Sequence, residues 1–242
     1  HVDINARNVI ALFLIVFGVF GNISFILAVQ SKKEIRNKHG ILLSIVCTAQ
    51  TICLFFELLK RCKLAVYNDL TRESCFRSVF IYIIAATYQS IGILIIGIDI
   101  LISLIVPVRY FHLRNFPYLI YLQIPCVIVS IAFPVYSISI DVPDVIIADC
   151  NPVLALKREV FLAWSWCNMA ICVLVVALYA AMVSIVLISI ANANRKSAFT
   201  YTDGICTKYS ANSQYQRRIV RSMMIFMGVF SFSWFFSNGA IH

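Results

Sequence analysis

Long stretches without a charged residue divide the chain into segments of membrane-spanning length. A helix that crosses a bilayer needs about 20 apolar residues, with charges mainly at its ends. Glu57 and Asp99 interrupt the pattern, each near the end of its stretch. The pattern predicts an all-α polytopic membrane helix bundle, one transmembrane domain over residues 1–242, with six helices at residues 8–31, 40–59, 78–106, 115–140, 160–194 and 222–241.

The overall composition excludes the soluble classes of protein. Of the 242 residues, 61% are hydrophobic and 13% are charged, whereas a soluble domain has roughly 45–50% apolar and about 25% charged residues. So few charges cannot cover a surface that faces water. A cytosolic enzyme, an ordinary nucleic-acid-binding domain and a disordered chain are therefore excluded, and the lipid bilayer is the expected surroundings.

The basic residues are divided unequally between the two sides of the predicted bundle. Loops one, three and five hold 12 of the 20 Lys and Arg residues, and the other side holds 8. The positive-inside rule then puts the odd-numbered loops in the cytoplasm and the N-terminus outside. Because topology explains the net charge of +9, the sequence predicts no nucleic-acid partner.

Two of the nine cysteines lie where an oxidising compartment is expected. Most of the others lie inside apolar runs, where a thiol behaves as a small hydrophobe. Cys75 and Cys150 should both face outward, and a disulfide between them would tie the fourth loop across the top of the third helix. Cys62 is also on the outward side and is an alternative partner.

No pattern in the sequence indicates catalysis or a metal site. There is no HExxH or CxxC spacing, and none of the four histidines lies in the middle of a predicted helix. The sequence therefore predicts a protein that is not an enzyme and that needs no cofactor and no metal.

Asp99 is the chemically informative residue of the third predicted helix. It lies 24 residues after Cys75, and at 1.5 Å per residue this is about 36 Å, the full length of a membrane helix. Cys75 therefore marks the outer end and Asp99 the inner end. An ionisable group inside a membrane helix is costly and usually functional; the alternative is a capping or snorkelling side chain at the interface.

The residues that follow Asp99 carry a family resemblance. An Asp with Pro107 eight positions later and Tyr110 eleven positions later resembles the inner end of helix three in rhodopsin-like G-protein-coupled receptors. Asn22, after Gly21, resembles the structural asparagine of their helix one. More narrowly, the run Cys-Asn-Pro-Val-Leu-Ala-Leu at 150–156 and Pro-Val-Arg-Tyr at 107–110 resemble nematode serpentine chemoreceptors of the Srsx class.

The resemblance implies a chemosensory receptor in the plasma membrane, including that of a sensory neuron, with an external small-molecule or peptide ligand. Polar and aromatic residues at the depth of such a pocket are Tyr82, Gln89, Trp164, Asn168, Trp234 and Asn238. Two alternatives remain open for them, because Trp and Tyr favour the membrane interface and amides bond between helices.

The implied intracellular partner is a heterotrimeric G protein. An inner switch at Asp99 and basic contacts from the odd loops are the expected means of coupling, through Arg109, Tyr110, Arg217, Arg218 and Arg221. The alternative for the basic loops is topology and attraction to anionic lipid alone.

The sequence departs from the receptor pattern in two ways that leave other functions open. Ile100 stands where the superfamily has an arginine, and the chain ends at His242 directly after the sixth predicted helix, so helix seven is expected to be absent. A truncated receptor remnant that does not signal is therefore an alternative. A transporter or channel is a weaker one, because the helix middles have almost no ionisable residues.

Overall fold

The computed structural model describes residues 2–33, 35–66, 70–138, 146–147, 150 and 152–199. The chain divides into two compact units, His1–Val175 and Val176–His242. All contacts discussed below lie within the first unit, apart from the course of one helix that continues into the second.

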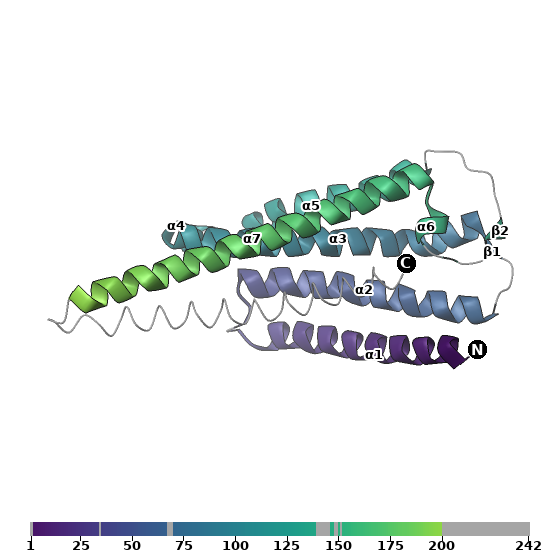
Figure 1. Ribbon diagram of the computed structural model, residues 1–242, viewed down its shortest axis with the longest axis horizontal. Helices are drawn as coiled ribbons and strands as arrows, with labels where there is room; N and C mark the ends of the chain where they lie inside the picture. Colours follow the sequence, from purple (N-terminus) through teal and green to yellow (C-terminus); the bar gives the residue numbers. More distant parts are fainter. Residues whose placement is uncertain are drawn as a thin grey trace. The chain divides into compact units, whose positions relative to one another are not determined.

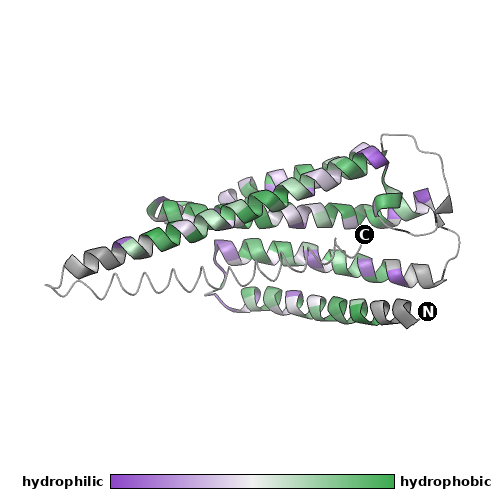
Figure 2. Cartoon of the chain, viewed as in Figure 1, coloured by the Kyte–Doolittle hydropathy of each residue, from purple (hydrophilic) through white to green (hydrophobic). Residues whose placement is uncertain are grey.

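Five long helices dominate the described residues (Figure 1): α1 (Val2–Ser31), α2 (Lys38–Val66), α3 (Arg72–Ile105), α5 (Asn115–Ile138) and α7 (Arg158–Phe199). Each contains a stretch long and apolar enough to cross a membrane, and Figure 2 shows hydrophobic residues along most of their length. The all-α membrane fold predicted from the charge-free stretches is confirmed. The sixth predicted helix, at residues 222–241, lies outside the described residues.

The observed helices begin and end several residues away from the predicted bounds. α1 begins at Val2 instead of residue 8, α3 begins at Arg72 instead of 78, and α7 runs to Phe199. α2 covers more than its predicted 40–59, whereas α5 ends at Ile138, two residues early. A stretch without charges marks only the part of a helix that lies in lipid. Where a helix continues into water it carries charged residues, and the pattern does not count those residues as part of the helix.

α3 lies in the centre of the first unit. α1 packs against α2, α2 against α3, and α3 against α5. In the membrane-spanning part of α3, 56% of the residues are buried, compared with 6% in α1. Gly92 permits the close approach of α2, because a Cβ there would lie 2.6 Å from Val46 Cγ2. Side chains of α3 are therefore shielded from lipid and free to take part in specific contacts.

Four short elements at the helix ends were not predicted. The strands β1 (Leu70–Thr71) and β2 (Ile146–Ile147) pair antiparallel, with Leu70 opposite Ile147. α4 (Pro107–His112) follows α3, and α6 (Pro152–Ala155) precedes α7. Thr71 also caps α3, since its hydroxyl accepts a 3.3 Å hydrogen bond from the Ser74 amide. These elements form the two ends of α3, where the candidate functional residues lie.

Candidate functional site

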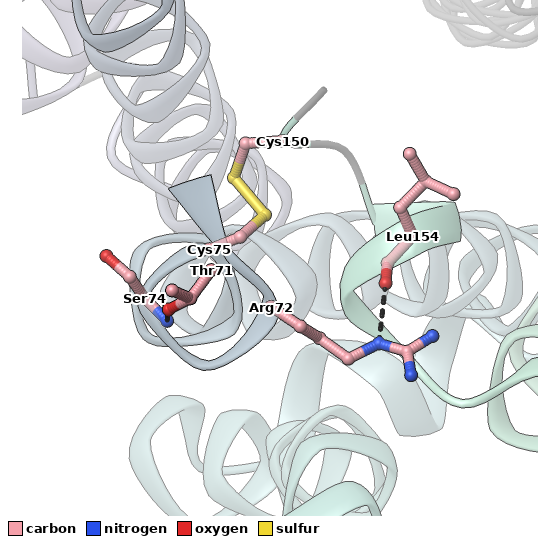
Figure 3. Close-up of a disulfide and its surroundings, with 6 residues drawn as sticks. All are labelled: Thr71, Arg72, Ser74, Cys75, Cys150 and Leu154. Atoms are coloured by element: carbon pink, nitrogen blue, oxygen red, sulfur yellow. Dashed lines mark hydrogen bonds between the residues drawn. A yellow bond between two sulfur atoms is a disulfide. The ribbon is translucent and has the colours of Figure 1, made fainter. Parts of the chain in front are cut away.

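A disulfide closes one end of α3. Cys75 in the first turn of α3 is bonded to Cys150, with a Cα–Cα distance of 5.4 Å (Figure 3). The predicted pairing is confirmed, and Cys62 is not the partner of Cys75. Beside the bond, Arg72 Nε donates a 3.0 Å hydrogen bond to the carbonyl oxygen of Leu154. The loop that precedes α7 is thereby attached to α3 at two points.

The same loop packs an apolar surface onto α3. Ala155, Leu156 and Val160 are almost completely buried and form one cluster with Cys75, Val79 and Ile83. The residues at 150–156 that carried the family resemblance therefore include some that attach the loop to α3. We call Cys150 with residues 152–156 the loop cap.

The described candidates for ligand binding lie on α3 and α7, near the loop cap. Tyr82 and Trp164 pack against the cluster beneath it, and Gln89 is half-buried two turns further along α3. Trp164 Nε1 donates a 2.7 Å hydrogen bond to Thr87 Oγ1, and Asn168 Nδ2 donates a 2.8 Å bond to the Trp164 carbonyl. Trp164 thus bonds across to α3, whereas the bond of Asn168 lies within α7. Trp234 and Asn238 lie outside the described residues.

An apolar groove of about 490 Å³ lies between α5 and the first turns of α7. Its lining comprises Ala132, Phe133, Val135, Tyr136, Val160 and Ala163. Of the four predicted ligand residues that the structure describes, none lines the groove, although Ala163 directly precedes Trp164 in the chain. The groove is an open one, because its lining residues Val135 and Tyr136 are 48% and 57% exposed.

We predict that Trp164 and Thr87 are energetically coupled. Trp164→Phe and Thr87→Val should each lower the free energy of unfolding by about 1 kcal/mol, because each leaves the other's buried polar group without this bond. Thermal unfolding of the purified chain in detergent measures this. The double variant should lose less than the sum of the two single losses; strictly additive losses would show that the bond contributes nothing.

The opposite end of α3 carries a cluster of polar side chains around Asp99, whose carboxylate is completely buried. Tyr118 of α5 donates a 2.7 Å hydrogen bond to Oδ1, and Tyr110 of α4 donates a 3.3 Å bond to Oδ2. His39 Nδ1 of α2 lies 2.5 Å from the same Oδ2, in ion-pair contact without the angle of a hydrogen bond. We call Lys38, His39, Asp99, Tyr110 and Tyr118 the Asp99 cluster.

Lys38 completes the cluster from α2. Its ammonium group donates a 2.6 Å hydrogen bond to the backbone carbonyl of Tyr110. It also lies 4.2 Å from the centroid of the Tyr110 ring and 5.5 Å from that of Tyr118, so cation–π attraction adds to the bond. Four elements, α2, α3, α4 and α5, are therefore joined at this end.

The electrostatics of the cluster keep Tyr110 in its neutral form. Burial, and then the charge and the hydrogen bond of Asp99, raise the pKa of the Tyr110 hydroxyl well above its ordinary value. Tyr110 therefore keeps its proton and donates a hydrogen bond to Asp99 throughout the physiological range. Ile100, where the superfamily has an arginine, is apolar and buried, so it gives Asp99 no charge partner.

Sequence reasoning found part of this cluster and missed part. Asp99 was predicted as an inner switch and Tyr110 as a contact of the partner. The structure brings these two residues together and buries Tyr110, whereas Arg109 lies on the exposed side of α4. Lys38, His39 and Tyr118 were missed. Two adjacent basic residues at the start of an apolar stretch were the available signal for the first two.

The remaining candidates are less informative. Asn22 of α1 is buried, and its Nδ2 has no hydrogen-bond partner in the described part of the chain. The structural role expected of it stays a prediction. Arg217, Arg218 and Arg221 lie outside the described residues.

Apolar helices of spanning length, a disulfide at one end of α3 and a buried acid at the other define a multi-pass helical membrane protein of the receptor type. The family model described as serpentine type 7TM GPCR chemoreceptor Srsx matches residues 15–242. The chain belongs to this family, which is a chemoreceptor family and not an enzyme family. No curated protein matches the chain.

Proposed function

We propose that the chain is a G-protein-coupled receptor of the plasma membrane that responds to an external small-molecule or peptide cue. The observation that carries the proposal is the pair of contrasting ends of α3. One end is closed by a disulfide, which needs an oxidising compartment. The other joins α4 to three long helices through the Asp99 cluster. We place the first end outside the cell, with the N-terminus, and the second in the cytoplasm.

The surface beside the Asp99 cluster supports a protein partner there. On α4, Val108 is 72% exposed, and Arg109 beside it is exposed as well. Exposed basic residues also lie in the two neighbouring loops, at Lys32, Lys33, Arg36 and Arg114. An apolar side chain surrounded by basic ones suits a protein surface that carries acidic groups around an apolar pocket. We infer that this surface binds the heterotrimeric G protein.

The end that carries the loop cap is where we propose that the cue binds. Tyr82, Trp164 and Asn168 lie in that half of α3 and α7, and Gln89 lies at the middle of α3. The apolar groove between α5 and α7 opens beside Trp164 and supports an apolar cue. Binding would change the signal by favouring one of two packings of the bundle, in proportion to its differential affinity for them.

Nucleotide exchange on purified G proteins tests the proposal. Cell membranes that contain the full chain are expected to accelerate exchange on at least one Gα class, and a pooled panel of volatile and peptide cues should raise the rate further. Val108→Asp and Arg109→Glu should each lower the basal rate by about tenfold, corresponding to a loss of about 1.4 kcal/mol of contact. Arg158→Glu, a charge reversal on the exposed first residue of α7 at the opposite end, is the matched control.

Two results would contradict the proposal. A chain that reaches the cell surface yet accelerates exchange on no Gα class would be a membrane protein of this family that does not signal through G proteins. Cue-evoked ion flux in cells without functional G proteins would indicate a channel instead. Antibody access to an N-terminal epitope on intact cells tests the orientation separately.

A further inference from the structure

The buried charge of Asp99 needs a cationic partner, and that partner comes from α2. A carboxylate removed from water is stable only when it is paired and hydrogen-bonded. Tyr110 and Tyr118 supply hydrogen bonds but no charge. Within the described residues, the basic side chains in contact with the cluster are Lys38, which is 7% exposed, and His39.

The two basic residues contact different parts of the cluster. His39 contacts the Asp99 carboxylate itself, and its ring stacks on Tyr110 with the centroids 5.6 Å apart. Lys38 instead bonds to the backbone of α4, at the Tyr110 carbonyl. Together they attach α4 both to the end of α2 and, through Asp99, to α3.

We propose that Lys38 and His39 are positioning residues that hold α4 in its resting place, with His39 making the strength of this hold depend on cytoplasmic pH. Since α4 is the element proposed to contact the G protein, the inference rests on the proposed function. A firmly held α4 corresponds to the resting receptor, and a loosened one to a higher basal activity.

The sign of the pH dependence follows from the groups that face Asp99. These are His39 and Lys38 from α2, Tyr110 from α4 and Tyr118 from α5. Of these side-chain types, histidine is the one whose charge ordinarily changes between about pH 5 and pH 8. A protonated His39 attracts the carboxylate it touches, and this contact is closer than any with Lys38. Acidification therefore strengthens the hold, and alkalinisation weakens it.

The side chain of His39 is in a position to sense the pH of the cytoplasm. It is 21% exposed, whereas the Asp99 side chain is completely buried. Solvent therefore reaches His39 without any opening of the bundle, whereas the Asp99 side chain is enclosed.

Two measurements on the full chain test the inference. The first is basal nucleotide exchange in membranes between about pH 6 and pH 8, relative to G protein alone at each pH. The wild-type rate should fall by about fivefold toward the acidic end, the factor expected for about 1 kcal/mol. His39→Gln, which cannot titrate, should give a flat profile at the high rate, and His39→Lys a flat profile at the low rate.

The second measurement does not depend on signalling. The thermal unfolding midpoint of the detergent-purified chain should be about 2 to 4 °C higher near pH 6 than near pH 8. This difference should disappear in His39→Gln. His112→Gln, which alters an exposed histidine of α4, is the matched control for unfolding and should keep the wild-type difference between the two midpoints.

Lys38 should contribute to the hold on α4 without contributing to its pH dependence. Lys38→Met removes the bond to the Tyr110 carbonyl and should raise basal exchange by about fivefold while keeping the slope against pH. Arg158→Met, at an exposed basic residue that begins α7 at the opposite end, should change neither.

The outcomes separate this inference from the proposed function. If unfolding depends on pH through His39 but no Gα class responds, the hold exists and the proposed function fails. If His39→Gln keeps the wild-type pH profile in both measurements, His39 does not sense pH and the inference is overturned. A Lys38→Met variant with the wild-type basal rate would refute the positioning role of Lys38.

Discussion

Replacement of Cys75 by serine is expected to lower the free energy of unfolding by about 2 to 5 kcal/mol and to remove most of the chain from the cell surface. The bond joins residues 75 positions apart, so its loss frees a long segment of the unfolded chain. It also releases the loop cap, whose Leu156 is buried completely against the start of α3. Thermal unfolding in detergent and surface labelling of intact cells measure the two effects.

The cysteine variants provide their own internal controls. Cys150→Ser should have the same effect as Cys75→Ser, and the double variant should be no worse than either, because all three lack the same bond. Cys167→Ser changes a half-buried free thiol of α7 and should stay near the wild type. Unequal effects of Cys75→Ser and Cys150→Ser would show that another pairing forms.

The long helices could be predicted because the bilayer imposes one rule on all of them. A spanning segment must be apolar over about 20 residues whatever its neighbours are, so the stretches ending at Ser31 and beginning at Asn115 were located from charges alone. The short elements follow no such rule. Thr71 ends a strand and caps a helix because of contacts with Ile146 and Ser74, and those contacts exist only after folding.

The candidate site could be predicted where a reactive or ionisable residue lies at a position that is uncommon for it in a membrane helix. A cysteine at one end of a span and an acid at the other are rare enough to be noticed, and Cys75 and Asp99 were found in this way. Their partners differ in how visible they are. Tyr110 lies 11 residues from Asp99 and was included, whereas the bond from Lys38 to Tyr110 joins residues 72 positions apart. No local pattern reports a contact made by the packing of α2 against α3.

The ligand candidates also show that the sequence does not identify the partner of a polar side chain. Trp164 and Asn168 were chosen as polar or aromatic groups at the depth of a pocket, and the alternatives left open were the membrane interface for Trp164 and a bond between helices for Asn168. The structure shows Trp164 donating to Thr87, a residue the pattern did not single out. Depth in the membrane predicts that a polar group must have a partner, and only packing identifies that partner.

Replacement of Asp99 by alanine is expected to lower the free energy of unfolding by about 3 to 5 kcal/mol. The change removes the acceptor of both tyrosine hydroxyls and the counter-charge of Lys38 and His39 at once. A buried positive charge without its partner costs more than the lost attraction, because the group stays out of water. Thermal unfolding of the purified chain in detergent measures the loss.

The matched variants of Asp99 distinguish lost charge from lost hydrogen bonds. Asp99→Asn keeps an acceptor oxygen for Tyr118 and nearly the same shape, so its loss should fall between those of the wild type and Asp99→Ala. His39→Leu added to Asp99→Ala should recover part of the stability, because it removes a polar side chain that has lost its contact with the carboxylate. Glu73→Ala changes an exposed acid in the first turn of α3 and should cost no more than about 1 kcal/mol. Wild-type stability in Asp99→Ala would show that the cluster does not hold the four elements together.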